Sequence, residues 1–184
     1  MHNLMLDLET LGTSPGCVVL SIGAVQFTRD GISGEFHTHI DLESSFEAGL
    51  VMEPRTVMWW LDQSKEAQNA FLQAETFPLV DALSALIDTF KWKDLRVWAN
   101  GASFDFPILK AAFQAANLEP PWRFYNEMDY RSIKNLVPKE VLNKLRVHPG
   151  IAHDALDDAR AQALTLNALI NWLGGETHED RLLA

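Results

Sequence analysis

Two carboxylates lie inside a stretch that otherwise has the pattern of a buried strand. In NLMLDLET, leucines alternate with the other residues, so Asp7 and Glu9 share one face of the predicted strand. A buried carboxylate without a partner is costly, and two neighbouring carboxylates repel each other. The pair therefore indicates a local source of positive charge, and bound metal ions would supply it.

Two further acids have similar surroundings. Asp105 follows a predicted strand in NGASFDFPIL, and Asp158 lies near the start of the last predicted helix in HDALDDARAQA. Hard divalent cations such as Mg²⁺ and Mn²⁺ prefer oxygen ligands. Two such ions about 3.5–4 Å apart can clamp the attacking and leaving oxygens of a phosphodiester. The four acids therefore suit metal-dependent phosphodiester hydrolysis.

His153 precedes Asp158 by five residues. Five helical steps of about 100° would place the two side chains about 140° apart, on different faces. We therefore expect His153 in the loop before the helix, with Asp154 as the N-cap and Asp157 at the capping-box position. A histidine there could take a proton from water at the metal site at neutral pH.

In this order, the segments DLET, NGASFD and HDALDD resemble the three motifs of the DEDD exonucleases, in the variant with histidine (DEDDh). The resemblance runs roughly from Leu4 to Leu173. It is strongest to a compact phage and bacterial branch in which LDLETLGT, LSIGAV and WWL recur, and which includes phage exodeoxyribonuclease A and a mycobacterial exoribonuclease that prefers adenosine. Single motifs are weak signals, whereas the ordered set is specific.

The resemblance implies a 3′–5′ exonuclease that acts on single-stranded DNA or RNA with a free 3′ end. It assigns two Mg²⁺ or Mn²⁺ ions to four carboxylates and the role of general base to His153. The product would be a 5′-mononucleotide. The implied metal ligands are Asp7, Glu9, Asp105 and Asp158.

The resemblance also places the terminal nucleotide against Thr10 and Leu11, with Leu11 wedged against the last base; ordinary core packing is an equal alternative for Leu11. Phe104 could stack on a base or fill the core. Ser103 could bond a phosphate, although capping of the helix that begins there is the preferred interpretation.

The adjacent tryptophans Trp59 and Trp60 diverge by about 100° on a helix, so we expect one to be buried. The other, taken as Trp59, could face the nucleotide. One position departs from the wider family: many DEDD enzymes have asparagine four residues before the second-motif aspartate, where this chain has Gly101, with Asn100 one residue earlier. A substrate role for Asn100 cannot therefore be taken from the wider family.

The elements around these residues predict an α/β fold. Three strands (3–10, 17–28 and 35–42) form an antiparallel meander, and helices and a further strand follow. The resemblance implies a ribonuclease H-like mixed sheet, in which parallel strands extend the meander and helices flank it. We expect one exonuclease domain over 1–175 and an acidic tail over 176–184. The expected later elements are helices 54–73, 78–92, 103–117, 131–139 and 153–175 and a strand at 95–101.

The formal net charge of the 184-residue chain is −10, which argues against a broad basic surface for nucleic acid. A local basic strip, YRSIKNLVPKEVLNKLRVH, could still guide phosphates, or could be a solvated face. The strip contains Arg131, Lys134, Lys139, Lys144 and Arg146.

Other features bear on setting and assembly. The single cysteine, Cys17, and the absence of a membrane span or signal peptide favour a cytoplasmic protein. Relatives implied by the resemblance form homodimers, so a homodimer is expected. Two other classes are a catalytically weak nucleic-acid-binding module of the same fold and a nucleotide phosphatase on another α/β fold. The intact set of five residues argues against both.

Overall fold

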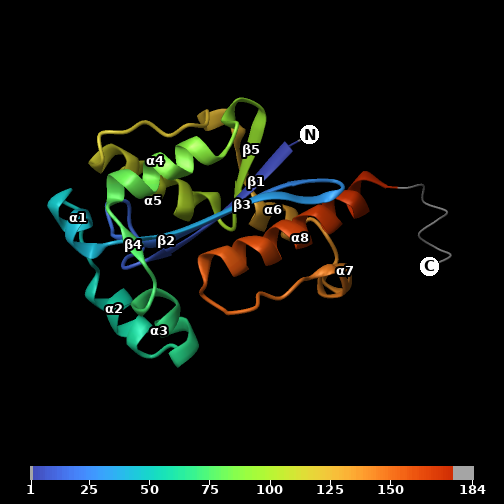
Figure 1. Ribbon diagram of the computed structural model, residues 1–184. Coiled ribbons are helices and arrows are strands. Elements are labelled where there is room, and N and C mark those ends of the chain that lie inside the picture. The colour runs from blue at the N-terminus through green and yellow to red at the C-terminus, as the bar shows by residue number, and fades with distance from the viewer. Residues whose placement is uncertain (1, 176–184) are drawn as a thin grey trace.

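A six-stranded mixed sheet forms the centre of the molecule in the computed structural model, which describes residues 2–175 (Figure 1). The first three strands in sequence pair antiparallel, and the other three pair parallel with their neighbours. This confirms the predicted mixed sheet. In spatial order the strands are β4 (Thr76–Phe77), β3 (Gly31–Ile40), β2 (Val19–Thr28), β1 (His2–Thr10), β5 (Leu95–Ala99) and β6 (Glu127–Asp129).

Helices cover both faces of this sheet. The long α8 (Ala155–Gly174) packs on one face with α6 (Tyr130–Asn135) and α7 (Lys139–Leu145), whereas α4 (Leu79–Thr89) and α5 (Ala102–Ala115) lie on the other (Figure 1). Side chains of β1 point alternately to the two faces of the sheet, so the strand contributes to both hydrophobic cores. Leu4, Leu6 and Leu8 belong to the core under α4 and α5, and Met5 belongs to the core under α8.

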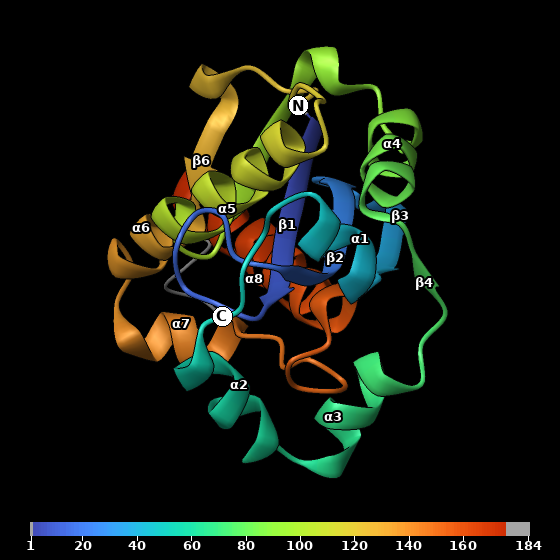
Figure 2. The same cartoon turned by 90° about the vertical axis from the view of Figure 1, so that its left-hand side faces the viewer.

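Three short helices extend beyond the edge of the sheet, namely α1 (Leu42–Glu47), α2 (Pro54–Leu61) and α3 (Lys65–Leu72). The single helix predicted over 54–73 is wrong. Ser64 interrupts it, because its hydroxyl accepts the Ala67 N–H and caps a new helix. As a result the chain changes direction between α2 and α3, and both helices lie beside the loop that leads into α8 (Figure 2).

Other boundaries also differ from the predictions. The third strand begins at Gly31 rather than at residue 35, because a tighter turn follows Thr28. The second strand begins at Val19, and Cys17 is instead buried in an isolated bridge to Val51. The predicted helix over 131–139 ends at Asn135, before Pro138 starts α7. Two short 3₁₀ helices, at Trp92–Asp94 and Phe124–Asn126, precede β5 and β6.

Between residues 2 and 175, no helix is long and apolar enough to cross a membrane. The predicted acidic tail over 176–184 lies outside the described residues.

Candidate active site

Asp7 and Glu9 lie on the central strand β1, on the face that α8 covers. Asp7 is opposite Gly23 of β2, and Glu9 is opposite Ser21. The register of β1 with β2 shifts between Glu9 and Thr10, which ends the regular pleat directly after the second acid. Both acids are therefore held on rigid backbone at the carboxyl end of β1.

Asp105 reaches the same place from α5. Strand β5 ends level with Leu6, and the Leu8 N–H beyond that point donates to the Asp105 carboxylate. The Asp105 side chain is thus bound to β1 beyond the end of β5. It is 4% exposed.

The turn from β5 into α5 explains the glycine at position 101. Gly101 is the N-cap of α5 with φ 106°, a conformation that favours glycine. A Cβ there would also lie 2.7 Å from the Arg131 guanidinium. The expected cap at Ser103 is wrong, because Ser103 lies inside the first turn, and Asp129 Oδ1 accepts the N–H groups of Gly101 and Ala102.

Asp158 comes from the first turns of α8, on the opposite layer. A Cβ on Gly23 would lie 2.1 Å from the Ala155 carbonyl oxygen, so only glycine allows α8 to approach β2 this closely. Asp154 caps α8 by accepting the N–H groups of Leu156 and Asp157, as predicted.

His153 lies in the loop before α8, as the helical-angle argument predicts. Its backbone φ is 64°, and its N–H donates to Asp158 Oδ2 at 3.0 Å. Its ring meets Trp59 edge-on, with centroids 4.9 Å apart. Trp60 lies 6.1 Å away and is fixed to β1, because its Nε1 donates to the Thr10 carbonyl oxygen. The imidazole is thus held between α2 and the start of α8.

The chain brings three of these groups within reach of one ion. One ligand atom each of Glu9, His153 and Asp158 lies within 4.8 Å of the other two. Asp7 interacts electrostatically with Glu9, Asp105 and Asp158. All five residues of the predicted set therefore converge on one place.

Burial disfavours ionisation of this cluster. Burial and the charge of Asp105 raise the pKa of Asp7 well above its usual range. Burial and the Asp158 charge raise the pKa of Glu9 to about 8. Burial raises the pKa of Asp105 to about 7, although its hydrogen bonds oppose the shift. Cations beside these groups would restore their ionised form.

A cavity of about 560 Å³ opens beside the cluster. Glu9, Thr10, Trp59 and Phe104 line it. Trp59 is 44% exposed and Trp60 only 4%, which confirms that the pair divides between surface and core. Leu11 is buried and lines a separate apolar cavity with Leu20 and Ile40, so the structure favours its packing role.

Comparisons with known proteins agree with this geometry. The model of a family described as the Rv2179c-like 3′–5′ exoribonuclease domain matches residues 2–170. The chain belongs to this family. An exodeoxyribonuclease of Enterobacteria phage T4 is 23% identical in an alignment of 211 positions, which covers 95% of this chain and 92% of that protein.

Solved structures share the fold. The nuclease domain of 3′hExo, a DEDDh family member bound to rAMP, has a TM-score of 0.59 at 17% identity, over 96% of this chain and 94% of that one. Escherichia coli exonuclease I bound to a dA16 oligonucleotide has a TM-score of 0.62 at 16% identity, over 92% of this chain and 40% of that one. With the family match, the chain is a 3′–5′ exonuclease, and it has the fold of a DEDDh family member.

Two residues beside the exonuclease acids were not predicted. Gln162, one turn after Asp158 on α8, donates from Nε2 to Asp7 Oδ1 at 2.7 Å. Its Oε1 is buried without a hydrogen-bond partner among the described residues. Gly23 is the second residue that was not predicted, and its lack of a side chain lets α8 approach β2. The i, i+4 spacing of Asp158 and Gln162 was the available signal, since it places both side chains on one helix face.

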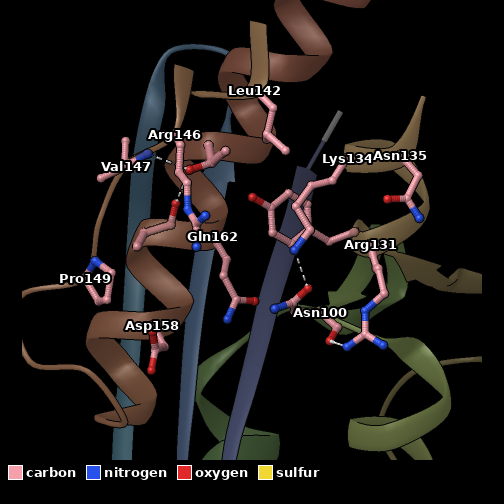
Figure 3. Close-up of a pocket in the computed structure, with 13 residues that line it drawn as sticks. Asn100, Arg131, Lys134, Asn135, Leu142, Arg146, Val147, Pro149, Asp158 and Gln162 are labelled. Carbon is pink, nitrogen blue, oxygen red and sulfur yellow. Dashed lines mark hydrogen bonds between the residues drawn. The ribbon is translucent and has the colours of Figure 1, made fainter. Parts of the chain in front are cut away.

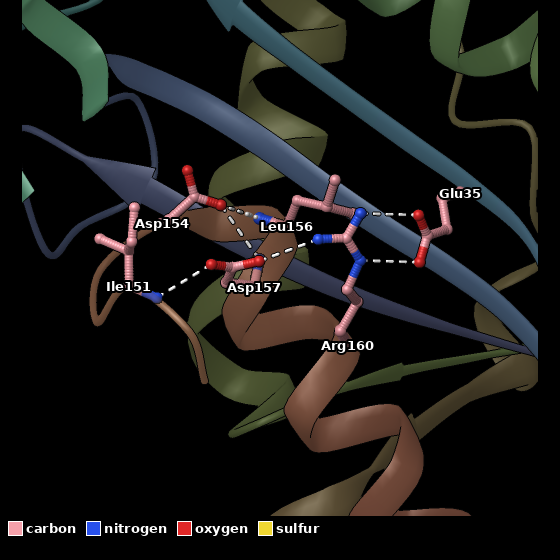
Figure 4. Close-up of polar contacts among 6 residues, drawn as sticks. All are labelled: Glu35, Ile151, Asp154, Leu156, Asp157 and Arg160. Carbon is pink, nitrogen blue, oxygen red and sulfur yellow. Dashed lines mark hydrogen bonds and ion pairs between the residues drawn. The ribbon is translucent and has the colours of Figure 1, made fainter. Parts of the chain in front are cut away.

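Arg160 fastens the first turns of α8 to β3 (Figure 4). Its Nε and NH2 groups donate to the two Glu35 oxygens at 2.7 and 2.8 Å, and NH1 donates to Asp157 at 2.9 Å. Asp157 in turn accepts the Ile151 N–H. The predicted capping-box role of Asp157 is therefore wrong, because this side chain holds the preceding loop instead of the Asp154 N–H.

Proposed function

We propose that this exonuclease hydrolyses the terminal phosphodiester at the 3′ end of single-stranded DNA or RNA by a two-metal mechanism and releases 5′-mononucleotides. The observation that carries the proposal is the convergence of Glu9, His153 and Asp158 within 4.8 Å, beside the half-buried Asp7 and the buried Asp105. A nucleic-acid-binding module would not need a buried cluster of repelling acids.

The donor set fits divalent metal ions. DEDDh exonucleases use such ions, and four carboxylates from three elements offer the oxygen ligands that Mg²⁺ and Mn²⁺ prefer. Asp7, Glu9, Asp105 and Asp158 would hold two of them. When bound, the ions supply positive charge that stabilises the phosphodiester as its negative charge develops. The raised pKa values of Asp7 and Glu9 support the fit, because a cluster without cations favours protonation.

His153 would act as the general base that takes a proton from the attacking water. The position of His153 supports this role. The Asp158 carboxylate fixes its backbone, and Trp59 fixes its ring. These contacts leave the imidazole beside the acids, within reach of water bound there. Gln162 orients the Asp7 carboxylate through its amide N–H.

The cavity lined by Thr10, Trp59 and Phe104 would receive the terminal nucleoside. The aromatic rings offer stacking surfaces worth about 1–3 kcal/mol per base. Leu11 packs in the core and lines the separate apolar cavity, and a wedge against the last base is its alternative role. Ser103, in the first turn of α5, could donate to the phosphate.

The sugar preference is open, because the similar proteins include an exodeoxyribonuclease and a family described as exoribonucleases. We further propose that residues 1–175 of each chain form a single exonuclease domain and that two chains associate as a cytoplasmic homodimer. Exposed apolar side chains on α2 and α3, namely Met58, Leu61 and Leu72, offer a surface for the dimer.

A side-by-side digestion tests the proposal. Matched 5′-labelled single-stranded DNA and RNA oligomers would be incubated with Mg²⁺, Mn²⁺ or EDTA. We expect a ladder that shortens from the 3′ end with metal, no ladder in EDTA, and 5′-mononucleotide products. The faster ladder identifies the preferred sugar. Undiminished digestion in EDTA would overturn the metal mechanism, and binding without digestion would favour the binding module.

A further inference from the structure

A further cavity, of about 400 Å³, lies between α6, the end of α7 and α8 (Figure 3). Three cations line it: Arg131 and Lys134 from α6 and Arg146 from the end of α7. Figure 3 shows Arg131 and Lys134 on one side and Arg146 on the other. A single carboxylate, Asp158, lies among the lining residues.

These three cations have no carboxylate partner within 4.0 Å in the part of the chain that the structure describes, where the ion pairs involve Lys110 and Arg160. Neutral groups hold two of them. Arg131 donates to the Asn100 carbonyl oxygen, and Lys134 donates to Asn100 Oδ1 at 2.8 Å. Because Asn100 adds no charge, the positive charge of both side chains remains available to an anion.

The cations also repel one another. Burial lowers the pKa of Lys134, and the charges of Arg131 and Arg146 lower it further. An anion between them would relieve this repulsion. A cavity with three cations and no internal counter-charge other than Asp158 therefore suits a phosphate group.

The cavity adjoins the acid cluster. Asp158 and Gln162 line it, and Gln162 also contacts Asp7. Arg131 interacts with the Asp105 charge from the same side. The cavity for the terminal nucleoside lies on the Glu9 side instead, with Trp59 and Phe104. The acids thus separate an aromatic cavity from a cationic one.

This arrangement indicates in which direction the single-stranded substrate would lie across the acids. A 3′-terminal nucleoside has no phosphate beyond it, so a cationic cavity is useful only on the 5′ side of the bond that is cut. We propose that Arg131, Lys134 and Arg146 form a subsite for the phosphate one nucleotide 5′ of the scissile phosphate. The inference rests on the proposed function. It gives a role to only three of the five cations of the basic strip, because Lys139 and Lys144 do not line the cavity.

The phosphate could be an internal diester or a terminal 5′-monoester, and three short substrates distinguish these sources. The dinucleoside monophosphate NpN has only the scissile phosphate, NpNpN adds an internal diester, and pNpN adds a terminal monoester. The sugar would be the preferred one. We expect kcat/KM to be at least about tenfold higher for NpNpN than for NpN, a value typical of one charge-assisted contact.

Arg146→Gln should lower the NpNpN to NpN ratio of kcat/KM by about tenfold, mainly through KM for NpNpN. Lys139→Gln, an equal change of charge outside the cavity, should leave the ratio unchanged. Lys134→Gln is the second variant, and circular dichroism melts would check the folding of each.

The outcomes separate the two proposals. A wild-type ratio near one, or a ratio that Lys139→Gln lowers as much as Arg146→Gln, would overturn the subsite while leaving the exonuclease intact. Gains confined to pNpN would overturn the internal diester and assign the subsite to a terminal monoester. No hydrolysis of any of the three or of a longer oligomer would overturn the proposed function, and the subsite with it.

Discussion

At the scale of single residues, the surroundings of Asp7 disfavour a charge on its carboxyl group. Asp7 is half-buried, and its desolvation and the charges of Asp105, Glu9 and Asp158 all raise its pKa. Only one neutral donor, Gln162, opposes this shift. A carboxylate in this position is destabilising without cations, which supports the proposed ligand role of Asp7.

Asp7→Asn tests that role. The amide oxygen can still accept the Gln162 N–H, so we expect the fold to persist. Loss of a supporting partner typically costs metal sites about 10–100-fold, so loss of a ligand should lower kcat by more than about 100-fold. Initial rates on a labelled oligomer measure this. Asp88→Asn, on the exposed side of α4, is the control, and activity of Asp7→Asn near the control value would place catalysis elsewhere.

His153→Gln tests the general base. Removing such a group typically lowers kcat by about 10²–10⁴-fold, and KM should change little because the residue is not assigned to binding. His148→Gln changes an exposed histidine in the same loop and should have no effect on kcat. Equal losses in both variants, or a loss confined to KM, would argue that His153 only shapes the loop.

The residue scale is also where sequence-based prediction succeeded most. Acids in an apolar strand stand out because they break the pattern, so Asp7 and Glu9 were visible. Gln162 and Gly23 were not, because an amide on a helix or a glycine in a strand suits many structural roles. Their importance follows from the contacts of α8 with β1 and β2, which no local pattern contains.

At the scale of elements, the site depends on how closely α8 approaches the sheet. Gly23 permits this approach, and Arg160 fixes it through Glu35 and Asp157. Together they place Asp158 and His153 opposite the carboxyl end of β1. A small displacement of α8 would therefore separate the ligands that come from different layers.

Gly23→Ala should produce that displacement. The added Cβ would lie 2.1 Å from the Ala155 carbonyl oxygen, so backbone must shift, and such overpacking typically costs about 1–3 kcal/mol. We expect a lower Tm and weaker Mn²⁺ binding. Gly34→Ala is the control, because its Cβ would have no neighbour closer than 3.7 Å. Calorimetric melts and Mn²⁺ titrations measure both, and equal behaviour of the two variants would contradict the packing argument.

Long periodic elements were predictable, and short ones were not. The apolar patterns of β1, β2, α5 and α8 fixed their type, whereas β4 and β6 have only two and three residues. Such strands exist because neighbouring strands pair with them. The break between α2 and α3 was also missed, since it depends on the Ser64 cap rather than on the hydrophobic period.

At the scale of the whole molecule, the net charge of −10 is compatible with a polyanionic substrate because charge is unevenly distributed. Acids gather where metal ions would neutralise them, and unpaired cations gather in the adjoining cavity. The charge of the chain alone therefore does not decide its partner.

The acid cluster should also make stability depend on pH. Unfolded carboxyl groups ionise near pH 4–4.5, whereas the folded pKa is about 8 for Glu9 and about 7 for Asp105. Between these values the folded chain retains protons that the unfolded chain has released. These two groups therefore lower the free energy of unfolding of the metal-free protein as pH rises from about 4.5 to about 8.

Melting curves in EDTA from pH 5 to pH 8.5 check this expectation. Asp105→Asn removes one titrating group, so its Tm should exceed that of the wild type by a few degrees at pH 8, at about 2–4 °C per kcal/mol, and the gap should narrow toward pH 5. Mn²⁺ should stabilise the wild type most at high pH. A gap that is absent, or that widens as pH falls, would contradict the raised pKa of Asp105.

The most direct test is a crystal soaked in Mn²⁺ with a 5′-mononucleotide and examined by anomalous scattering. We expect two manganese peaks among Asp7, Glu9, Asp105 and Asp158, with the phosphate beside them and His153 facing it. Crystals of Asp7→Asn should lose at least one peak. No manganese at these carboxylates under conditions in which the enzyme digests oligomers would contradict the account.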